Sequence, residues 1–153
     1  MKFRVMMALA GAGVMLAAGT AYAQLGAKEA VGARINAYRE TGSAFKTIND
    51  QLKSKTPLKI MLRASAKTIN ASARDQYAWF PAGSGPESGL KTKAKAAVWS
   101  DAAGFRDAQS RFQREADLML KVVETGDQAQ MQKQAKALGQ ACSSCHQKFR
   151  VED

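Results

Sequence analysis

Apolar residues recur at helical spacing along most of the chain and divide it into four segments. The first segment runs from roughly Ala27 to Lys53, and its apolar or small residues follow one another at steps of three and four. Such steps place side chains on one face of an α-helix. The stripe consists of Val31, Ile35, Tyr38, Gly42, Phe45, Ile48 and Leu52. We therefore predict an amphipathic helix over this first segment.

A second helix is predicted from Thr56 and Pro57 to about Gln76. Threonine is a favoured N-cap and proline is favoured at the first helical position, so this pair indicates a helix start. A weaker stripe of apolar and small residues continues from Leu58 to Ala73. This stripe gives the second helix a buried face.

The segment from Tyr77 to Ala97 is predicted to be a long connection, since it holds two of the three prolines and three glycines. Connections of this length are commonly functional or cross between elements. We expect its aromatic side chains to fold back onto the helices. Three lysines are expected to face water, namely Lys91, Lys93 and Lys95.

Two further helices are predicted after this connection. Ser100 is the expected N-cap of the third, and Asp101 lies in its first turn, where the helix dipole favours a carboxylate. Gly126 ends the third helix and Asp127 caps the fourth. The fourth has the most regular stripe: Met131, Ala135, Leu138, Cys142, Cys145 and Phe149. No alternating strand pattern is visible, so we predict an all-α, antiparallel four-helix bundle with one longer loop between helices 2 and 3.

Residues 1–23 have the pattern of a secretory signal peptide. Lys2 and Arg4 form a basic start, Val5 to Ala18 is uncharged, and Ala21-Tyr22-Ala23 gives a small–x–small cleavage site. The apolar run is about 14 residues, shorter than the ~20 needed to span a bilayer, which argues against a membrane anchor. We therefore predict cleavage after Ala23, a periplasmic domain from 24 to 153, and no membrane insertion of the mature chain.

Composition narrows the class of protein further. The chain has 153 residues, 46% of them apolar, which is one globular domain and excludes disorder. It carries 23 basic against 13 acidic residues, but the lysines are scattered and no aromatic residues are interleaved for base reading. Export also argues against nucleic acid as a partner. A basic surface can steer an acidic redox partner, although a solvated surface is the simpler explanation.

Both cysteines and the only histidine lie in one pentapeptide, Cys142-Ser143-Ser144-Cys145-His146. This is the C-x-x-C-H signature of covalent haem c attachment. Residues three apart share a helix face, so the two thiols can add to the two vinyl groups at one porphyrin edge. The imidazole of His146 is then aimed at the iron. Export agrees with this interpretation, because thioether formation consumes thiols that would otherwise form a disulfide.

Two other uses of the pentapeptide are weaker. A thioredoxin-type disulfide needs a βαβ setting, which the sequence does not predict. A zinc site built from two cysteines and one histidine leaves the fourth ligand position unexplained.

With this motif at the end of a four-helix pattern, the chain resembles the class II c-type cytochromes, the cytochrome c′ family. Phe149-Arg150 resembles the family's aromatic–Arg ending, residues 98–105 resemble the segment that opens the third helix, and Arg34 resembles a first-helix arginine near a haem propionate. The resemblance implies one covalently attached haem c per chain and periplasmic redox partners. It also implies a homodimer through helices 1 and 2, which the small residues of these helices permit. Arg150, four residues after His146, is expected on the same side of the haem.

The sixth coordination position of the iron decides the function. Methionine is the usual second protein ligand, and low-spin relatives in this class place it on the first helix. In this chain that position is Tyr38, and the first helix has no methionine. We predict a five-coordinate haem with His146 as sole protein axial ligand and Tyr38 on the distal side. The alternatives for Tyr38 are a tyrosine–iron bond and a core aromatic with a hydrogen-bonded hydroxyl.

Two functions fit these residues. The first is electron transfer by an exported haem protein that also binds NO or CO, with O2 disfavoured if no donor stabilises it. The alternative is a protein dedicated to nitric-oxide sequestration or sensing, with no electron-carrier role. An enzyme is not expected, because the only histidine is used on the iron and no distal imidazole remains for acid–base catalysis.

Overall fold

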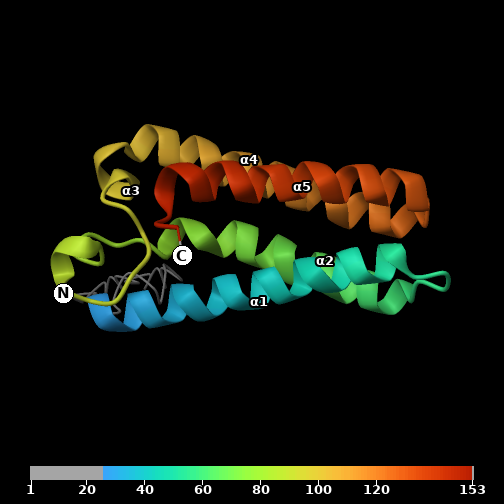
Figure 1. The fold of residues 1–153 in the computed structure, drawn as a ribbon, viewed down its shortest axis with the longest axis horizontal. Helices are drawn as coiled ribbons and strands as arrows, with labels where there is room; N and C mark the ends of the chain where they lie inside the picture. Colours follow the sequence, from blue (N-terminus) through green and yellow to red (C-terminus); the bar gives the residue numbers. More distant parts are fainter. Residues whose placement is uncertain (1–25, 153) are drawn as a thin grey trace, which may run out of the picture.

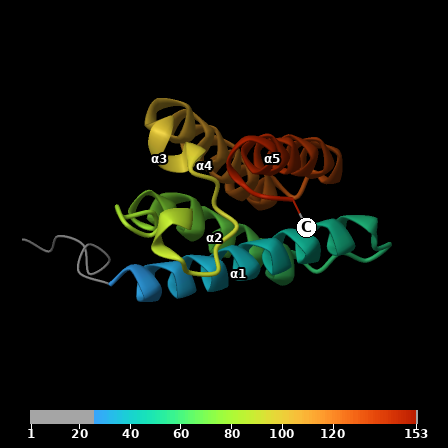
Figure 2. The ribbon, with the colours of Figure 1, turned by 60° about the vertical axis from the view of Figure 1, so that its left-hand side comes forward.

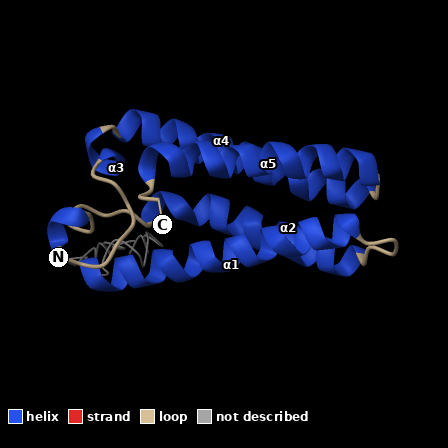
Figure 3. Ribbon diagram, viewed as in Figure 1, coloured by secondary structure: helices blue, strands red, loops and turns tan. Residues whose placement is uncertain are grey.

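The computed structural model describes residues 26–152 and shows a bundle of antiparallel helices (Figures 1 and 3). The predicted signal peptide, residues 1–23, lies outside the described residues. No strand is present from residue 26 to residue 152, and no helix there is long and apolar enough to span a bilayer. The helices are α1 (Ala27–Lys53), α2 (Lys59–Asp75), α3 (Ala97–Ser100), α4 (Ala102–Thr125) and α5 (Gln128–Phe149).

The four long helices form two layers. Figure 1 shows α1 and α2 as one antiparallel pair and α4 and α5 as the other, and the pairs pack on each other mainly through α2 and α4. The core between them consists of the stripes predicted from the sequence. Its fully buried side chains include Ile48, Ile69, Met119 and Leu138. The predicted four-helix bundle is therefore confirmed.

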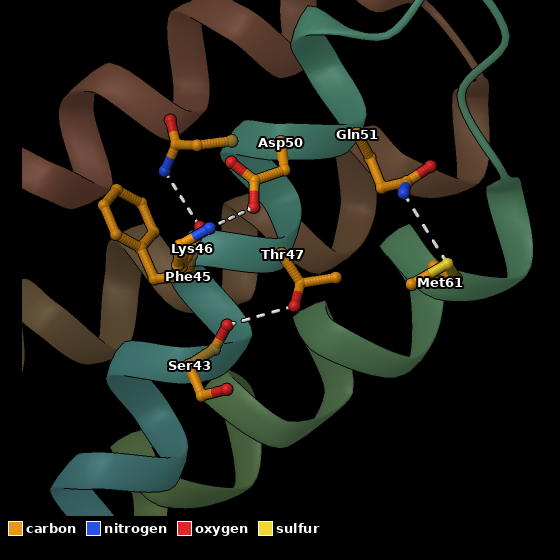
Figure 4. Close-up of polar contacts among 8 residues, drawn as sticks. Ser43, Phe45, Lys46, Thr47, Asp50, Gln51 and Met61 are labelled. Atoms are coloured by element: carbon orange, nitrogen blue, oxygen red, sulfur yellow. Dashed lines mark hydrogen bonds and ion pairs between the residues drawn. The ribbon is translucent and has the colours of Figure 1, made fainter.

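Helix bounds agree with the predictions for α1 and α5, but both N-caps predicted from serine or threonine are wrong. Helix α2 begins at Lys59, after Leu58, whose backbone is extended. The reason is Gln51 at the end of α1, whose Oε1 accepts from the Leu58 amide at 2.8 Å. The Nε2 of Gln51 donates to the sulfur of Met61 at 3.6 Å (Figure 4). This side chain thus holds the chain extended beyond Thr56, and Thr56 does not cap the helix.

The second wrong N-cap is Ser100, which ends the short helix α3. Helix α4 begins at Ala102 and is capped by Asp101, whose side chain accepts from the Gly104 amide at 3.0 Å. Aspartate is as good an N-cap as serine, and its carboxylate also suits the positive helix end. The join between α4 and α5 is as predicted, since Gly126 has φ +75° and Asp127 accepts from the Gln130 amide.

The long connection joins the two layers at one end of the bundle (Figures 1 and 2). Its aromatic residues fold back as predicted, since Trp79 is buried and Phe80 packs edge-on against Phe105 of α4, with centroids 4.8 Å apart. Lys91 and Lys93 are exposed as predicted. Lys95 differs from the prediction, since it is half-buried and its ammonium donates to the Gln147 carbonyl of α5.

The last part of the connection pairs with the end of the chain. The amide of Lys95 donates to the carbonyl of Phe149 at 2.9 Å, and the amide of Val151 donates to the carbonyl of Lys93 at 2.8 Å. We call residues 91–95 the strap. This pairing fixes the strap beside the C-terminal end of α5.

Candidate functional site

A cavity of about 960 Å³ lies between α1, the strap and the end of α5. Small-molecule sites in proteins have volumes of roughly 300–1,000 Å³, so this cavity is at the upper end. All six residues predicted for the haem site line it, namely Arg34, Tyr38, Cys142, Cys145, His146 and Arg150. The fold therefore brings together residues from the two ends of the chain.

Cys142 and Cys145 lie one helical turn apart on the cavity face of α5 and are not joined in a disulfide. Both are half-buried. Burial raises the pKa of each thiol to about 11. Both sulfurs are therefore protonated at neutral pH, and they stand side by side where one edge of a flat ligand can meet them.

His146 follows one residue later, at the same wall of the cavity. Partial desolvation, followed by the positive charge of Arg150, lowers the pKa of the imidazole. The ring is therefore neutral at physiological pH, which is the form that binds a metal ion. The amide of Arg150 donates to the carbonyl of His146 at 2.9 Å, so the two residues share the last turn of α5.

Tyr38 lies on the opposite wall, on α1. Its ring contacts Trp79 edge-on, with centroids 4.9 Å apart, and its hydroxyl donates to Oε1 of Gln76 at 3.4 Å. Burial, with smaller contributions from the cysteines, raises the pKa of Tyr38 far above its ordinary value. The phenol therefore keeps its proton and packs as an aromatic side chain with a hydrogen-bonded hydroxyl.

Arg34 has a structural role that the sequence did not reveal. Its side chain is 3% exposed and donates to Ser84 Oγ at 2.8 Å, to the Ser84 carbonyl at 2.6 Å, and to Thr92 Oγ1 at 2.7 Å. Its guanidinium also lies 4.9 Å from the ring centre of Phe80. Arg34 thus fastens the long connection to α1. No local sequence signal could show this, because its partners are 50 and 58 residues away.

Sequence reasoning also missed Gln76 and the cations at the rim. Gln76 is 3% exposed and lines the cavity. A glutamine at the end of a predicted helix carries no sequence pattern that would indicate a site residue. The rim carries Arg39, Lys91 and Lys93 in addition to Arg150, whereas Arg34 is buried in the cavity lining. No Asp or Glu is among the described residues that line the cavity. The charge of the rim suits an anionic ligand group.

These residues fit a haem attached through sulfur. The cavity offers two adjacent thiols, a neutral imidazole, apolar side chains such as Phe45 and Phe112, and cations at the rim for carboxylates. Within residues 26–152, no group of three or more His, Cys, Asp and Glu side chains could hold a metal ion. The donor set suits a metal that arrives inside a porphyrin better than an ion bound by protein ligands alone.

Comparison with known proteins gives cytochromes c′ and, at 32% identity over 91 residues, a cytochrome c-556 of Agrobacterium tumefaciens. Residues 29–150 match the family model described as Cytochrome C′. The cytochrome c′ of Pararhodospirillum photometricum is 34% identical over 118 residues, covering 76% of this chain and 92% of that protein. The cytochrome c′ of Rubrivivax gelatinosus is 44% identical over 68 residues, so this match spans only 53% of the relative's length and 44% of this chain.

Solved structures show the same architecture. A crystal structure of the Rubrivivax gelatinosus cytochrome c′ has a TM-score of 0.75 at 28% identity, covering 82% of this chain and 97% of that one. A cytochrome c′ with ligand-controlled dimer dissociation has a TM-score of 0.79 at 23% identity, covering 85% and 100%. A nitric oxide complex of a mutant cytochrome c prime from Alcaligenes xylosoxidans has a TM-score of 0.74 at 23% identity, covering 83% of this chain and 97% of that one. The chain belongs to the cytochrome c′ family, whose members carry covalently bound haem c in a four-helix bundle.

Proposed function

We propose that this protein is a periplasmic electron-transfer protein whose haem iron has His146 as its only protein axial ligand and binds NO or CO at its sixth position. The observation that carries the proposal is the convergence of Cys142, Cys145 and His146 on one wall of a cavity whose other wall is Tyr38. When bound, the haem supplies an iron that cycles between the ferric and ferrous states and binds small ligands.

Each residue of the α5 wall has a distinct task in this proposal. The thiols of Cys142 and Cys145 add across vinyl groups, so that each sulfur bonds to one carbon and its hydrogen goes to the other. The neutral imidazole of His146 donates a nitrogen lone pair to the iron. Arg150 borders this imidazole, and its charge, which already lowers the pKa of His146, disfavours additional positive charge at the iron.

The positions of the methionines support five-coordination. Met119 and Met131 are buried in the core, at 0% and 3% exposure, and Met61 is exposed at the start of α2. No methionine is among the cavity-lining residues in the described part of the chain, 26–152. The distal wall instead presents the neutral phenol of Tyr38, which covers the sixth position with bulk and supplies no strong ligand.

Arg34 remains our proposed partner of a haem propionate, with a modified role. Its guanidinium lines the cavity, yet its terminal nitrogens already donate to the long connection. Its contribution to propionate binding therefore comes mainly from its buried positive charge, which strengthens attraction at low dielectric. Charge-assisted contacts at the rim are left to more exposed cations such as Arg39 and Lys91.

Nitric-oxide sequestration or sensing is the second candidate. The apolar, aromatic distal wall at Tyr38 favours a small neutral ligand over water or anions. The nitric oxide complex of the Alcaligenes xylosoxidans protein, which shares this fold, agrees with this idea. Electron transfer remains our first choice because the cationic rim suits the approach of acidic redox partners.

We also propose export and self-association. Cleavage after Ala23 would release the chain described by the fold. A hollow between α1 and α2 is lined by Glu40 and otherwise by small or short polar side chains such as Ala44, Ser65 and Thr68. Ser43 and Thr47, which Figure 4 shows on α1, also line it. Close packing of a second copy on this face gives a homodimer. A structurally similar cytochrome c′ is described as undergoing ligand-controlled dimer dissociation.

Absorption spectra test the proposed coordination. We expect the purified protein, produced in a host competent for cytochrome maturation, to have the mass of the 24–153 chain plus one haem. Its ferrous spectrum should be high-spin and should shift on adding CO or NO. Absence of covalent haem contradicts the whole proposal. A low-spin spectrum that ignores CO contradicts five-coordination and leaves only electron transfer.

Two substitutions test the ligand assignments. Tyr38→Met should create a low-spin form that resists CO, because the thioether reaches the sixth position; an unchanged high-spin spectrum means that Tyr38 is not above the iron. His146→Ala should abolish the native Soret and visible bands. Gln147→Ala, at the exposed neighbouring position, is the matched control and should keep them.

A further inference from the structure

The hydroxyl of the distal tyrosine is held by a buried glutamine. Tyr38 donates to Oε1 of Gln76 at 3.4 Å, and Gln76 lines the same cavity while being only 3% exposed. Gln76 lies where α2 passes into a 3-10 turn (Gln76–Ala78), so it comes from a different element than Tyr38. The contact therefore joins α1, which carries Tyr38, to the end of α2, which carries Gln76.

The orientation of the Gln76 amide is fixed by its other contacts. Its Nε2 donates to the carbonyl of Ala73 at 3.0 Å and to the carbonyl of Gln109 at 3.2 Å. The Nε2 of Gln109 donates back to the carbonyl of Gln76 at 3.2 Å. An amide nitrogen only donates and an amide oxygen only accepts, so the oxygen is the atom that must face the phenol.

This orientation decides which way the phenolic proton points. Beside an acceptor, Tyr38 has to donate, so its proton is directed at Gln76 and only oxygen lone pairs and the ring face the rest of the cavity. The next hydroxyl on this wall, that of Thr41, donates to the Ala37 carbonyl of its own helix at 2.8 Å. The hydroxyl protons of Tyr38 and Thr41 are thus already used.

We propose that Gln76 is a positioning residue that withholds the hydroxyl proton of Tyr38 from a ligand on the iron. A bound O2 gains from a distal hydrogen-bond donor, whereas NO and CO bind without one. Gln76 thereby sets the preference of the site for NO and CO over O2. The inference rests on the proposed position of Tyr38 above the iron. It adds the reason why Tyr38, although polar, offers a ligand on the iron no hydrogen-bond donor.

Infrared spectra of the ferrous CO complex test this inference in the holoprotein. Gln76→Met removes the acceptor at similar volume and frees the phenol. We expect the C–O stretching frequency to fall and CO dissociation to slow by about fivefold, equivalent to ~1 kcal/mol at 1.4 kcal/mol per factor of ten. Tyr38→Phe should match the wild type. The double variant Tyr38→Phe/Gln76→Met should return to the wild-type band.

The outcomes separate the possible failures. If Tyr38→Met stays high-spin, the proposed position of Tyr38 is wrong. If that variant is low-spin but Gln76→Met has the wild-type band, or if the double variant keeps the shifted band, the role of Gln76 is wrong. Ser110→Ala is the control, because it removes an equally long tyrosine contact, Tyr77 to Ser110 at 3.4 Å, outside the cavity. An equal band shift in this control also overturns the inference.

One measurement needs no substitution and covers the case in which Gln76→Met does not fold. The C–O band of the wild-type protein should have the same frequency in H2O and D2O, since no exchangeable proton contacts the ligand. A solvent isotope shift shows that the phenol donates to the ligand, which refutes the role of Gln76.

Discussion

Arg34→Met should destabilise the protein more than any other replacement of a cavity-lining cation. The guanidinium is 3% exposed and makes three short hydrogen bonds, two to Ser84 and one to Thr92, at 2.6–2.8 Å. A hydrogen bond from a charged donor contributes about 1.5–3 kcal/mol. Desolvation of the cation offsets part of this gain, and the bonds share one side chain, so they do not add fully.

We expect Arg34→Met to lower the free energy of unfolding by about 3 kcal/mol in total, because the variant also leaves the Ser84 carbonyl and hydroxyl buried with fewer partners. For a domain of this size, such a loss lowers the melting temperature by on the order of 10 °C. Thermal unfolding of the holoprotein, followed by far-UV circular dichroism, measures it. Thr92→Val removes one of these bonds together with the acceptor of the Ala94 amide at 3.1 Å. It should cost about 1–2 kcal/mol, and only the part due to Arg34 should vanish in the Arg34→Met background.

Lys28→Met is the matched control, since Lys28 lies on the same helix but is exposed and is not among the described residues that line the cavity. Surface replacements of this kind change stability by less than about 0.5 kcal/mol. Equal melting temperatures for the two variants would refute the assignment of Arg34 as the anchor of the long connection.

Three further predictions concern the core, a turn and the thiols. Met119→Ala should cost about 2–5 kcal/mol in urea unfolding, because Met119 is fully buried, whereas Leu118→Ala beside it, at 43% exposure, should change little. Gly126→Ala should cost about 1 kcal/mol, measured in the same way, since φ is +75° there. Before haem attachment, alkylation of Cys142 and Cys145 by iodoacetamide should be slow at pH 8 and should rise toward pH 11, because only the thiolate reacts and burial raises the pKa of both thiols to about 11. In the urea-unfolded chain the rate should be half-maximal near the ordinary thiol pKa of 9.0 and level off about one pH unit above it, and equal profiles would contradict the burial effect.

Local sequence patterns predicted the helices well because their determinants lie within a few residues. The stripe from Val31 to Leu52 shares one helix face at any tertiary arrangement, and α1 has the predicted bounds. The predicted caps failed where a neighbouring side chain competed for the helix start. At Thr56 the deciding contact is the side chain of Gln51, and at Ser100 the next residue, Asp101, captured the first turn of α4.

The site residues likewise fall into two groups, those that local spacing predicts and those that depend on distant parts of the chain. The thiols and imidazole of α5 sit within five consecutive residues, so their spacing alone indicated haem attachment. The surroundings could not be predicted from spacing. Arg34 meets Ser84 across 50 residues, and Tyr38 meets Gln76 across 38. These contacts depend on the path of the long connection, for which proline and glycine indicate only irregular structure.

That connection also explains why the bundle is open at one end. Phe80 lies between the two layers, where its ring contacts Tyr38 of α1 on one side, with centroids 6.3 Å apart, and Phe105 of α4 on the other. Phe105 in turn contacts Phe149 of α5 at 5.1 Å, so a chain of rings joins the distal wall to the wall that carries the cysteines. These contacts and the Arg34 anchor connect the two walls through protein groups alone, so the long connection fixes the spacing of α1 and α5 around the cavity.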